Sequence, residues 1–332
     1  MSDNGSRSGS RRSPHATDEA GKVLALAGGV GGAKMAHGLQ MAIPDGALSV
    51  VVNTGDDFKL WGLHISPDID TVTYTLSGLA SKAQGWGLEG DTWQGLEMMA
   101  RYGRDPWFRL GDMDMVTHVL RTQMLHEGRT LTEATRDLAQ SLGIKSAILP
   151  MSDQPVETLI QTTDGDLDFQ DYFVRRRHAD TVTGVVFRGI DESRPTQEVI
   201  EAIGAATAVI FCPSNPVVSI GPLLAVPGML DALQASAAPT VAVSPIVGGT
   251  ALKGPAADML LSLGHEVSPY GVAAMYKGII DGIIIDNLDE RHASRIRDMG
   301  IAVEISDTIM KSDADRRALA ETALRFCRSL AG

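Results

Sequence analysis

The stretch VLALAGGVGGAKMAHGL, residues 23–39, combines an apolar run, four glycines in five positions and a helix-like continuation. A buried strand, a glycine turn and a helix in this order are typical of an α/β fold. The glycines are Gly28, Gly29, Gly31 and Gly32. They let the backbone approach a ligand, and the amides of the following helix favour an anion. Lys34 stands where a GxGxxG pattern needs its third glycine, so the turn is a candidate phosphate site of no known class, or a turn without a ligand.

Short apolar runs recur along the chain and predict strands. They cover residues 23–27, 48–53, 147–151, 183–190, 208–214, 240–246 and 282–287. Because amphipathic stretches separate them, the pattern predicts an α/β fold with a Rossmann-like, mostly parallel sheet and helices on both faces. Residues 157–174, with Asp164 and Gly165 between two alternating segments, predict a β-hairpin. Ligands of such sheets bind at the carboxyl ends of the strands, so the residues after each strand are the first candidates for a site.

The segment at about residues 76–143 lacks strand patterns and has the periodicity of helices. Thr130 and Glu133 have the spacing of a capping box at the start of its last helix. We therefore expect a single α/β domain over residues 22–332 with an all-helical insertion at about 76–143. Residues 1–21 are rich in Ser, Gly and Arg, and we expect them to form a disordered N-terminal extension.

The composition excludes several classes of protein. The chain has 332 residues, 44% of them hydrophobic, and a formal net charge of −12. A nucleic-acid surface needs clustered Lys and Arg, so we expect no nucleic-acid partner. No apolar run approaches the roughly 18 residues of a membrane span, and Cys212 and Cys327 match no metal-binding spacing. We expect a cytoplasmic protein with no membrane partner and no disulfide framework.

Carboxylates crowd the segment VVNTGDDFKLWGLHISPDIDTVTYTL, residues 51–76. After the strand come Asp56 and Asp57, and then Asp68 and Asp70. Four carboxylates at a strand end repel one another in a dry cleft, so a cation is expected among them. Hard oxygen ligands beside a phosphorylated substrate suit Mg²⁺. The alternative is a solvated acidic turn in which Asp70 only caps a helix.

Two further groups of residues are candidates. In RLGDMDMVTH, residues 109–118, we prefer the interpretation that Asp112 caps the helix that Asp114 begins. The alternative places Arg109 in a lid over a planar substrate, together with Trp86, Trp93 and Trp107. Ser214 and Asn215 offer hydrogen-bonding groups after a later strand. We expect no zinc site, because His37, His64 and His118 have no evident partners in the sequence.

Taken together and in this order, these motifs resemble the 2-phospho-L-lactate transferase family of coenzyme F420 biosynthesis. The resemblance runs from GGVGGAK through NTGDDFKLWGLHISPDIDTVTYTL and LGDMDMVTH to PSNPVVSIGPLL and SPIVGG, over about residues 23–325. It implies a magnesium-dependent transfer of a phospholactyl-type group from a guanosine-diphosphate donor to the ribityl hydroxyl of the deazaflavin Fo, with release of GMP. It also implies a homodimer. The three-carbon acid of the donor, phospholactate, enolpyruvyl phosphate or phosphoglycerate, stays open.

The resemblance also implies roles for residues of this sequence. Asp70 and Arg109 fall where the family contacts Fo, and Thr71 adjoins them. Asp56 and Asp70 fall where the family holds its metal. Gly28, Gly29, Gly31, Gly32, Ser214 and Asn215 fall in the nucleotide-binding turns. We take Asp70 as the candidate base, with Asp56 as a second catalytic residue, and regard Asp56, Asp57, Asp68 and Asp70 as the possible metal ligands.

Two rival interpretations remain. The gluconeogenesis-factor proteins, which bind nucleotide sugars as regulators, resemble this chain in the glycine turn and the PSN loop. The paired NTGDD and PDIDT motifs favour the transferase. A nicotinamide dehydrogenase is a distant third, because the glycine spacing fails and the second strand ends in Asn53 rather than in an acid that binds ribose.

Overall fold

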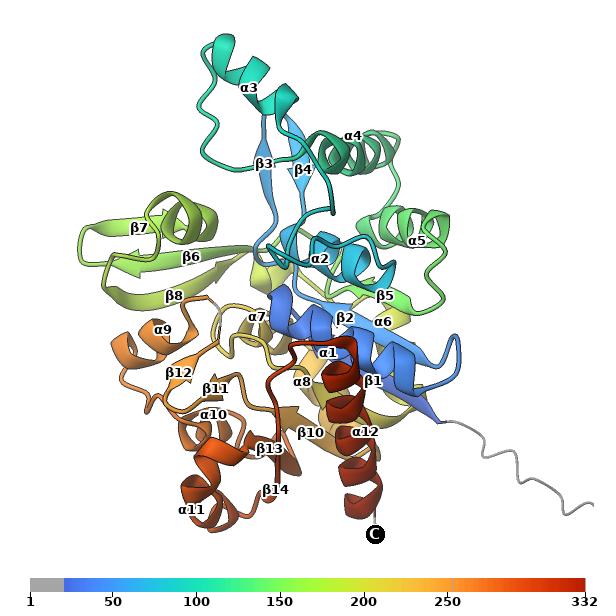
Figure 1. The fold of residues 1–332 in the computed structure, drawn as a ribbon, viewed down its shortest axis with the longest axis vertical. Coiled ribbons are helices and arrows are strands. Elements are labelled where there is room, and N and C mark those ends of the chain that lie inside the picture. The colour runs from blue at the N-terminus through green and yellow to red at the C-terminus, as the bar shows by residue number, and fades with distance from the viewer. Residues whose placement is uncertain (1–20, 253, 332) are drawn as a thin grey trace, which may run out of the picture.

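A seven-stranded parallel sheet forms the centre of the computed structural model, which describes residues 21–252 and 254–331 (Figure 1). The strand order is β14-β13-β10-β9-β1-β2-β5. The strands are β1 (Lys22–Ala27), β2 (Leu48–Val52), β5 (Ala147–Pro150), β9 (Ala206–Phe211), β10 (Thr240–Val243), β13 (Gly282–Asp286) and β14 (Ala302–Ser306). The predicted Rossmann-like parallel sheet is confirmed. The predicted N-terminal extension lies, except for Gly21, outside the described residues.

Strand β1 occupies the position in the sheet that determines where a ligand can bind. The chain first adds β2 and β5 on one side of β1, and then returns to add β9 on the other side. Leu26 pairs with Val51 of β2 and with Phe211 of β9, so β1 is hydrogen-bonded on both edges. The order of strands therefore changes direction between β1 and β9, and ligands of such sheets bind at the carboxyl ends of the strands beside this switch point.

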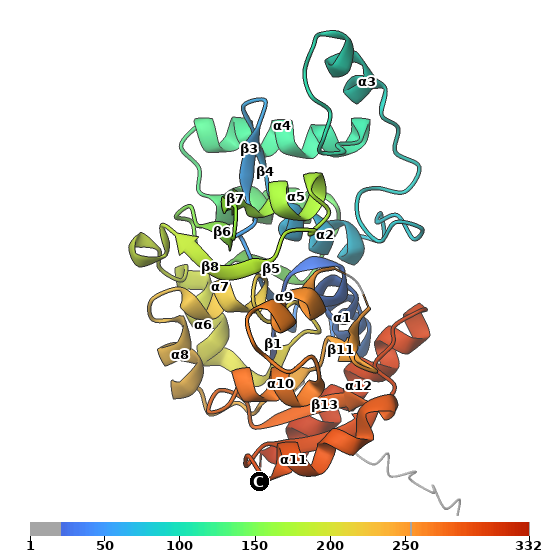
Figure 2. The same cartoon turned by 90° about the vertical axis from the view of Figure 1, so that its left-hand side faces the viewer.

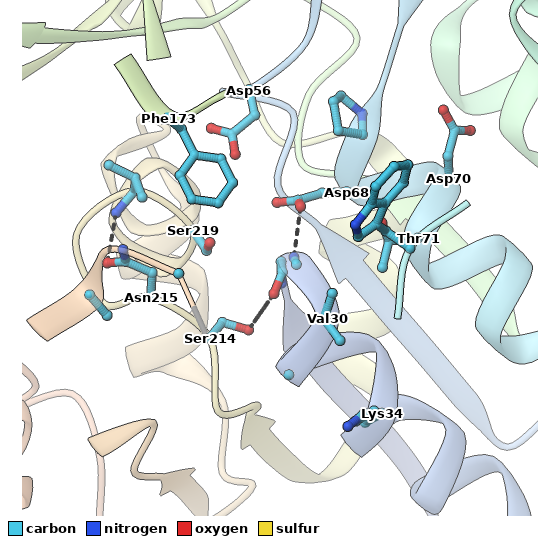
Figure 3. A pocket seen from close by; sticks show the side chains of 18 of the residues that line it. Val30, Lys34, Asp56, Asp68, Asp70, Thr71, Phe173, Ser214, Asn215 and Ser219 are labelled. Carbon is cyan, nitrogen blue, oxygen red and sulfur yellow. Dashed lines mark hydrogen bonds between the residues drawn. The ribbon is translucent and has the colours of Figure 1, made fainter. Parts of the chain in front are cut away.

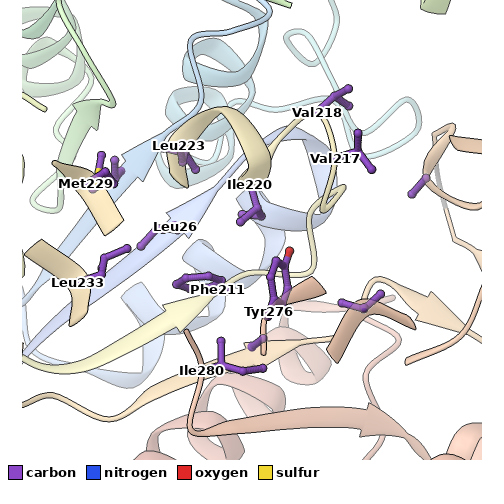
Figure 4. Packing of buried hydrophobic residues seen from close by; sticks show 14 of the residues in the cluster. Leu26, Phe211, Val217, Val218, Ile220, Leu223, Met229, Leu233, Tyr276 and Ile280 are labelled. Carbon is purple, nitrogen blue, oxygen red and sulfur yellow. The ribbon is translucent and has the colours of Figure 1, made fainter. Parts of the chain in front are cut away.

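Helices cover both faces of this sheet because side chains alternate along each strand. In β1, Val23, Ala25 and Ala27 pack against α1 (Gly29–Ala42), α2 (Pro67–Leu76), α5 (Leu131–Ser141) and α12 (Asp313–Leu330). Leu24 and Leu26 face the opposite side, where α6 (Gln197–Ala205), α7 (Ile220–Ala225), α8 (Met229–Ala235), α10 (Pro269–Met275) and α11 (Ala293–Arg297) pack (Figure 4). Each fully buried Leu contributes about 1.5–3 kcal/mol to this core.

The segment between β2 and β5 rises from the sheet as a separate layer. It begins with a hairpin, β3 (Phe58–Leu60) and β4 (Leu63–Ile65), which the sequence did not predict, and continues with α2, α3 (Gln94–Arg101), α4 (Asp112–His126) and α5. A small aromatic cluster that includes Phe58, Trp107 and Phe108 joins the hairpin to the loop before α4. Figure 2 shows α3 and α4 at one end of the molecule and α11 at the other.

Helix caps in this layer correct one prediction. The Asp112 carboxylate accepts hydrogen bonds from the amides of Gln94 (3.0 Å) and Gly95 (2.8 Å), so it caps α3 and not its own helix. Asp91 instead accepts from the amides at the start of α4. The predicted capping box at the start of α5 is confirmed.

A second, antiparallel sheet follows β5. It contains β6 (Glu157–Thr162), β7 (Gly165–Asp168) and β8 (Val182–Arg188) in the order β7-β6-β8, so the predicted hairpin is confirmed. The prediction that residues 183–190 belong to the parallel sheet is wrong, because β8 pairs antiparallel with β6 and remains half exposed. The seventh strand of the parallel sheet is instead β14. The sequence did not predict it, because it is only partly buried and contains Glu304, so it has no continuous apolar run.

The remaining elements are short. They are a π-helical turn (Asp171–Arg175), two 3₁₀ turns (Ile190–Glu192 and Asn287–His292), β11 (Ile246–Val247), β12 (Thr250–Ala251) and α9 (Ala256–Ser262). Cys212 and Cys327 are free and buried. Within the part of the chain that the structure describes, no helix has both the length and the apolar character needed to cross a bilayer.

Candidate active site

A cavity of about 840 Å³ opens at the carboxyl ends of the parallel strands. This volume lies in the range of small-molecule sites. Its walls come from the loops after β1, β9, β10 and β14, from α2, from the helical layer and from the turn after β7. Most of the residues selected from the sequence line it: Gly28, Gly29, Gly31, Asp56, Asp68, Asp70, Thr71, Arg109, Ser214 and Asn215. Gly32 and Asp57 lie behind the wall.

The glycine turn joins β1 to α1 at the floor of this cavity (Figure 3). Gly28 is the N-cap of α1, and Gly29 has a φ of +62°, which favours glycine. The Ser214 hydroxyl accepts from the amide of Gly28 (3.1 Å) and donates to its carbonyl oxygen (2.9 Å). A Cβ on Gly31 would lie 2.2 Å from the carbonyl oxygen of Pro213. The glycines thus allow the loops after β1 and β9 to touch.

Asp68 places its carboxylate at the N-terminus of α1. Its Oδ1 accepts from the amide of Gly29 (2.7 Å), and its Oδ2 accepts from Nδ2 of Asn53 (2.9 Å). Asn53 is itself held, since its Oδ1 accepts from the amide of Gly55 and its Nδ2 also donates to the carbonyl of Val218. Burial outweighs these hydrogen bonds and raises the pKa of Asp68 to about 6.

Asp56 lies beside Asp68 and has less support, since hydrogen bonding to Asn53 only partly offsets its burial. Its Oδ1 is buried and has no hydrogen-bond partner among the described residues. Burial, and then the nearby charge of Asp68, raise the pKa of Asp56 well above its usual range. In Figure 3 Asp68 is bonded to the glycine turn, whereas Asp70 lies apart from it, further along α2. Two buried carboxylates with an unfilled oxygen have the chemistry of an oxygen site for a hard cation.

Asp57 is held through one of its two oxygens. Oδ2 of Asp57 accepts from the Ser66 hydroxyl (2.7 Å) and lies 3.0 Å from Nε2 of His64. Burial nevertheless raises the pKa of Asp57. The expectation that His64 has no partner is therefore wrong.

Asp70 forms a buried ion pair with Arg121 of α4. Nη1 of Arg121 donates to Oδ2 of Asp70 at 3.1 Å, and Nη2 donates to Oδ1. Arg121 is 1% exposed. Because α2 begins at Pro67, Asp70 lies within the helix and does not cap it. The four aspartates thus divide into two groups. The charges of Asp56, Asp57 and Asp68 act on one another, whereas Asp70 pairs with Arg121 of α4.

Next to this ion pair lie three side chains whose partners the sequence did not reveal. The Tyr74 hydroxyl donates to Oδ1 of Asp114 (2.7 Å), and Nε2 of His118 lies 3.3 Å from the same oxygen. Nδ1 of His118 lies 3.6 Å from Oδ2 of Asp70, so the expectation that His118 lacks partners is also wrong. Burial alone would raise the pKa of Asp114, but hydrogen bonding to His118 and its charge outweigh it and lower that pKa.

Asp70, Asp114 and His118 offer ligand-type atoms within 4.8 Å of one another, which is close enough for a metal ion. Arg121 already supplies positive charge to this group through Asp70. A guanidinium repels a second cation at this distance. The buried pair formed by Asp56 and Asp68, whose nearness to each other raises the pKa of Asp56, is therefore the better candidate metal site.

Aromatic side chains cover the part of the cavity under the helical layer. Arg109 lies over the ring of Trp93, with its Cζ 4.2 Å from the ring centroid, and lines the cavity together with Trp86. Trp107 belongs to the aromatic cluster below the hairpin. Of the three tryptophans considered for a lid, Trp86 alone contacts the cavity directly. This wall is apolar and suited to a planar ring.

Several cavity residues escaped the sequence analysis. Phe169 and Phe173 stack with ring centroids 5.6 Å apart and form the wall beside Asp56. Their i, i+4 spacing after the hairpin was the available signal. Lys34 donates to the carbonyl of Met310 (3.1 Å), which ties α1 to the cavity-lining loop after β14. The sequence analysis did not predict β14 and therefore did not identify the loop that follows it.

The fold is that of a Rossmann-like α/β protein. Its small-molecule cavity lies at the topological switch point of the sheet and is lined by glycines and aspartates. The family model described as 2-phospho-L-lactate transferase CofD matches residues 23–324. The chain therefore belongs to the CofD family and is an enzyme, a transferase.

Relatives of known name agree with this assignment. The chain is 40% identical over 315 residues to a phosphoenolpyruvate transferase of Streptomyces griseus, with 93% of this chain and 99% of the relative covered. It is 37% identical over 303 residues to a 2-phospho-L-lactate transferase of Methanosarcina mazei, with 91% and 99% covered. A solved UPF0052-family structure from Bacillus halodurans shares the fold, with a TM-score of 0.64 at 15% identity over 92% of this chain and 99% of that one.

Proposed function

We propose that this transferase moves a three-carbon phospho-acid group from a guanosine-diphosphate-activated donor to the ribityl hydroxyl of the deazaflavin Fo. GMP is the leaving group, and the reaction belongs to coenzyme F420 biosynthesis. Family membership supports the reaction class. The observation that carries the proposal is the buried pair of Asp56 and Asp68 beside the glycine turn, where a diphosphate and its metal ion fit together.

Asp56 and Asp68 are the residues that we propose hold Mg²⁺. The unfilled Oδ1 of Asp56 and the like charge of Asp68 are both satisfied by a divalent cation. When bound, the ion neutralises negative charge on the donor diphosphate. Asp70 is less suited to this role, because both of its oxygens accept from Arg121. Asp57 also has a buried oxygen without a partner in the described part of the chain, but it does not line the cavity.

The nucleotide half of the cavity lies over the glycine turn. We propose that the amides of Val30 and Gly31 bind donor phosphate, since Gly29 already donates to Asp68. Ser214 holds the turn rigid through its two bonds to Gly28. Oδ1 of Asn215 accepts from the amide of Val217 (2.9 Å), which fixes the neighbouring loop. These residues position the leaving GMP.

The acceptor half lies under the helical layer. Trp86, Arg109 and the buried Thr71 line it, and we propose that they contact Fo. The aromatic face of Trp86 suits the flat deazaflavin, and Arg109 supplies donors at its rim. A primary hydroxyl on the ribityl chain then reaches the donor phosphorus between the two halves. Positioning of this kind lowers the barrier without a covalent enzyme intermediate.

The three-carbon acid of the donor stays open among phospholactyl, phosphoenolpyruvyl and phosphoglyceryl groups. The relatives are named for two of them, phosphoenolpyruvate and 2-phospho-L-lactate. Competition between the three guanylylated donors, measured as kcat/KM ratios on one preparation, identifies the preferred acid.

The test of the proposed function is incubation with Fo, Mg²⁺ and each guanylylated donor, followed by mass spectrometry of the products. We expect GMP and a phosphodiester-linked deazaflavin with at least one donor. No product with any donor, together with tight binding of a UDP-sugar, would favour the regulator interpretation instead.

We also propose that the enzyme is a homodimer. Helix α4 directs Asp114, His118 and Arg121 inward, whereas its exposed side carries apolar residues: Met113, Val116, Val119 and Leu120. This reverses the usual arrangement of a surface helix, and a second copy would cover the apolar side. Light scattering at micromolar concentration should give a molar mass twice that of one chain. The Val116→Glu variant should have the mass of a single chain.

A further inference from the structure

Asp114 occupies a defined position at the edge of the acceptor half. It lies in the first turn of α4, where the Asp91 carboxylate accepts from its amide at 3.0 Å, and it lines the cavity. Its side chain is 12% exposed. A carboxylate in the first turn of a helix is stabilised in its charged form by the helix dipole.

Only one of its two oxygens is committed to the protein. Oδ1 accepts from the Tyr74 hydroxyl and lies 3.3 Å from Nε2 of His118. Among residues 21–252 and 254–331, no side chain or amide donates to Oδ2. The carboxylate is thus oriented by two neighbours and keeps an oxygen for a ligand hydroxyl.

The neighbouring groups are less suited to accept a proton. Both oxygens of Asp70 accept from Arg121. Nη1 of Arg121 also lies 3.4 Å from Nδ1 of His118, and Nε2 of His118 lies 3.3 Å from Oδ1 of Asp114. Nδ1 of His118 thus faces Asp70 and Arg121 while Nε2 faces Asp114, and we assign His118 the role of orienting Asp114.

We infer that Asp114 is the catalytic base that accepts the proton of the acceptor hydroxyl. This inference rests on the proposed function and replaces Asp70, the base expected from the sequence. The hydroxyl oxygen forms a bond to the distal phosphorus of the donor, and its proton passes to Oδ2 of Asp114. The bond between that phosphorus and the bridging oxygen breaks, and GMP leaves with the electron pair. Asp114 then releases the proton to solvent.

The charged and titratable groups around Asp114 determine the pH dependence of this step. Tyr74 and Asp70 face it from α2, His118 and Arg121 from α4, and Asp91 from the preceding loop. Asp114 stays ionised at neutral pH. At saturating Mg²⁺, which keeps Asp56 and Asp68 ionised, we therefore expect the titration of Asp114 to give kcat no acidic limb near pH 6–7.

The test compares Asp114→Asn with Asp112→Asn in steady-state kinetics. Asn keeps the acceptor oxygen for Tyr74 but takes no proton, so we expect kcat to fall by about 10²–10⁴-fold with little change in the KM of Fo. Asp112 is partly exposed, lies outside the cavity wall and caps α3, and its variant should keep the wild-type kcat.

Asp114→Glu keeps a carboxylate and should recover part of the lost rate, which guards against a folding defect in the Asn variant. Unchanged kcat in a folded Asp114→Asn variant would overturn the assignment. So would a loss confined to the KM of Fo. Absence of product in the wild type would instead contradict the proposed function, so the two failures are distinguishable.

Discussion

The carboxylate of Asp68 lies 2.7 Å from the amide of Gly29, at the N-terminus of the helix that follows the glycine turn. In many nucleotide-binding folds an anion of the ligand occupies this position. Here the protein supplies the first anion itself, and Asn53 fixes its direction. The donor phosphates must then use the next amides and a cation beside Asp68. The glycine turn and the aspartates are therefore parts of one site.

The pH dependence of stability follows from this pair of carboxylates. The pKa of Asp68 is about 6 in the folded chain and that of Asp56 is well above its usual range, whereas both have ordinary values near 3.8 in the unfolded chain. A raised folded pKa gives stability that is complete below about pH 4 and is lost as pH rises through the folded value. For the metal-free protein, Tm from differential scanning calorimetry should therefore fall between about pH 5 and pH 7.5, and Mg²⁺ should reverse this fall. A Tm that rises over this interval would contradict the paired site.

Asp56→Asn should separate stability from activity. The amide removes one of two like charges and leaves the cavity shape unchanged, so the metal-free variant should melt at or above the wild-type Tm at pH 7.5. Its turnover should fall by at least about 10²-fold, because the cation site loses a ligand. Asp166→Asn, an exposed change on β7, is the control and should alter neither quantity. Wild-type turnover of Asp56→Asn at low Mg²⁺ would exclude Asp56 as a ligand.

Gly31→Ala tests whether the two loops at the switch point must touch. The new Cβ would lie 2.2 Å from the carbonyl oxygen of Pro213 and would push α1 away from the loop after β9. Donor KM should rise by about tenfold or more, because a shift of this size misplaces the phosphate-binding amides. Gly204→Ala is the matched control: it is exposed on α6 with open space around its Cβ, and should stabilise the fold by up to about 1 kcal/mol.

Removal of Arg121 should destabilise the fold strongly. Arg121→Ala would leave the buried Asp70 without its partner, and such losses cost about 3–5 kcal/mol. Urea denaturation should show this as a lower midpoint. Arg129→Ala removes an exposed pair with Asp137 and should change the midpoint far less. Equal midpoints for the two variants would mean that the buried pair does not hold α4 onto α2.

The sequence predicted those parts of the fold where a single local pattern decides the structure. The runs at β1, β2 and β13 are apolar except for Lys22, Ser49 and Asp286, because both faces of those strands are buried. Strand β14 is only half covered, so it gives no such run and its loop was missed. The strand at residues 182–188 was predicted but assigned to the wrong sheet, because a local pattern of residues does not determine with which strand it pairs.

The site was predicted less completely because its contacts join distant segments. Nearness in sequence suggested that four aspartates share one cation, but α2 turns Asp70 toward Arg121, 51 residues further along the chain. Asp112 and Asp114 are two residues apart, yet one caps a neighbouring helix and the other faces the cavity. Such assignments depend on tertiary packing that no motif records.

The most direct measurement is the stoichiometry of products in a single turnover. Enzyme in excess over a guanylylated donor is mixed with Fo and Mg²⁺, and GMP and the deazaflavin phosphodiester are quantified together. We predict one GMP for each diester, complete loss of both with EDTA, and strong loss of both in Asp56→Asn. GMP release without the diester, or formation of diester at an unchanged rate in EDTA, would contradict the account.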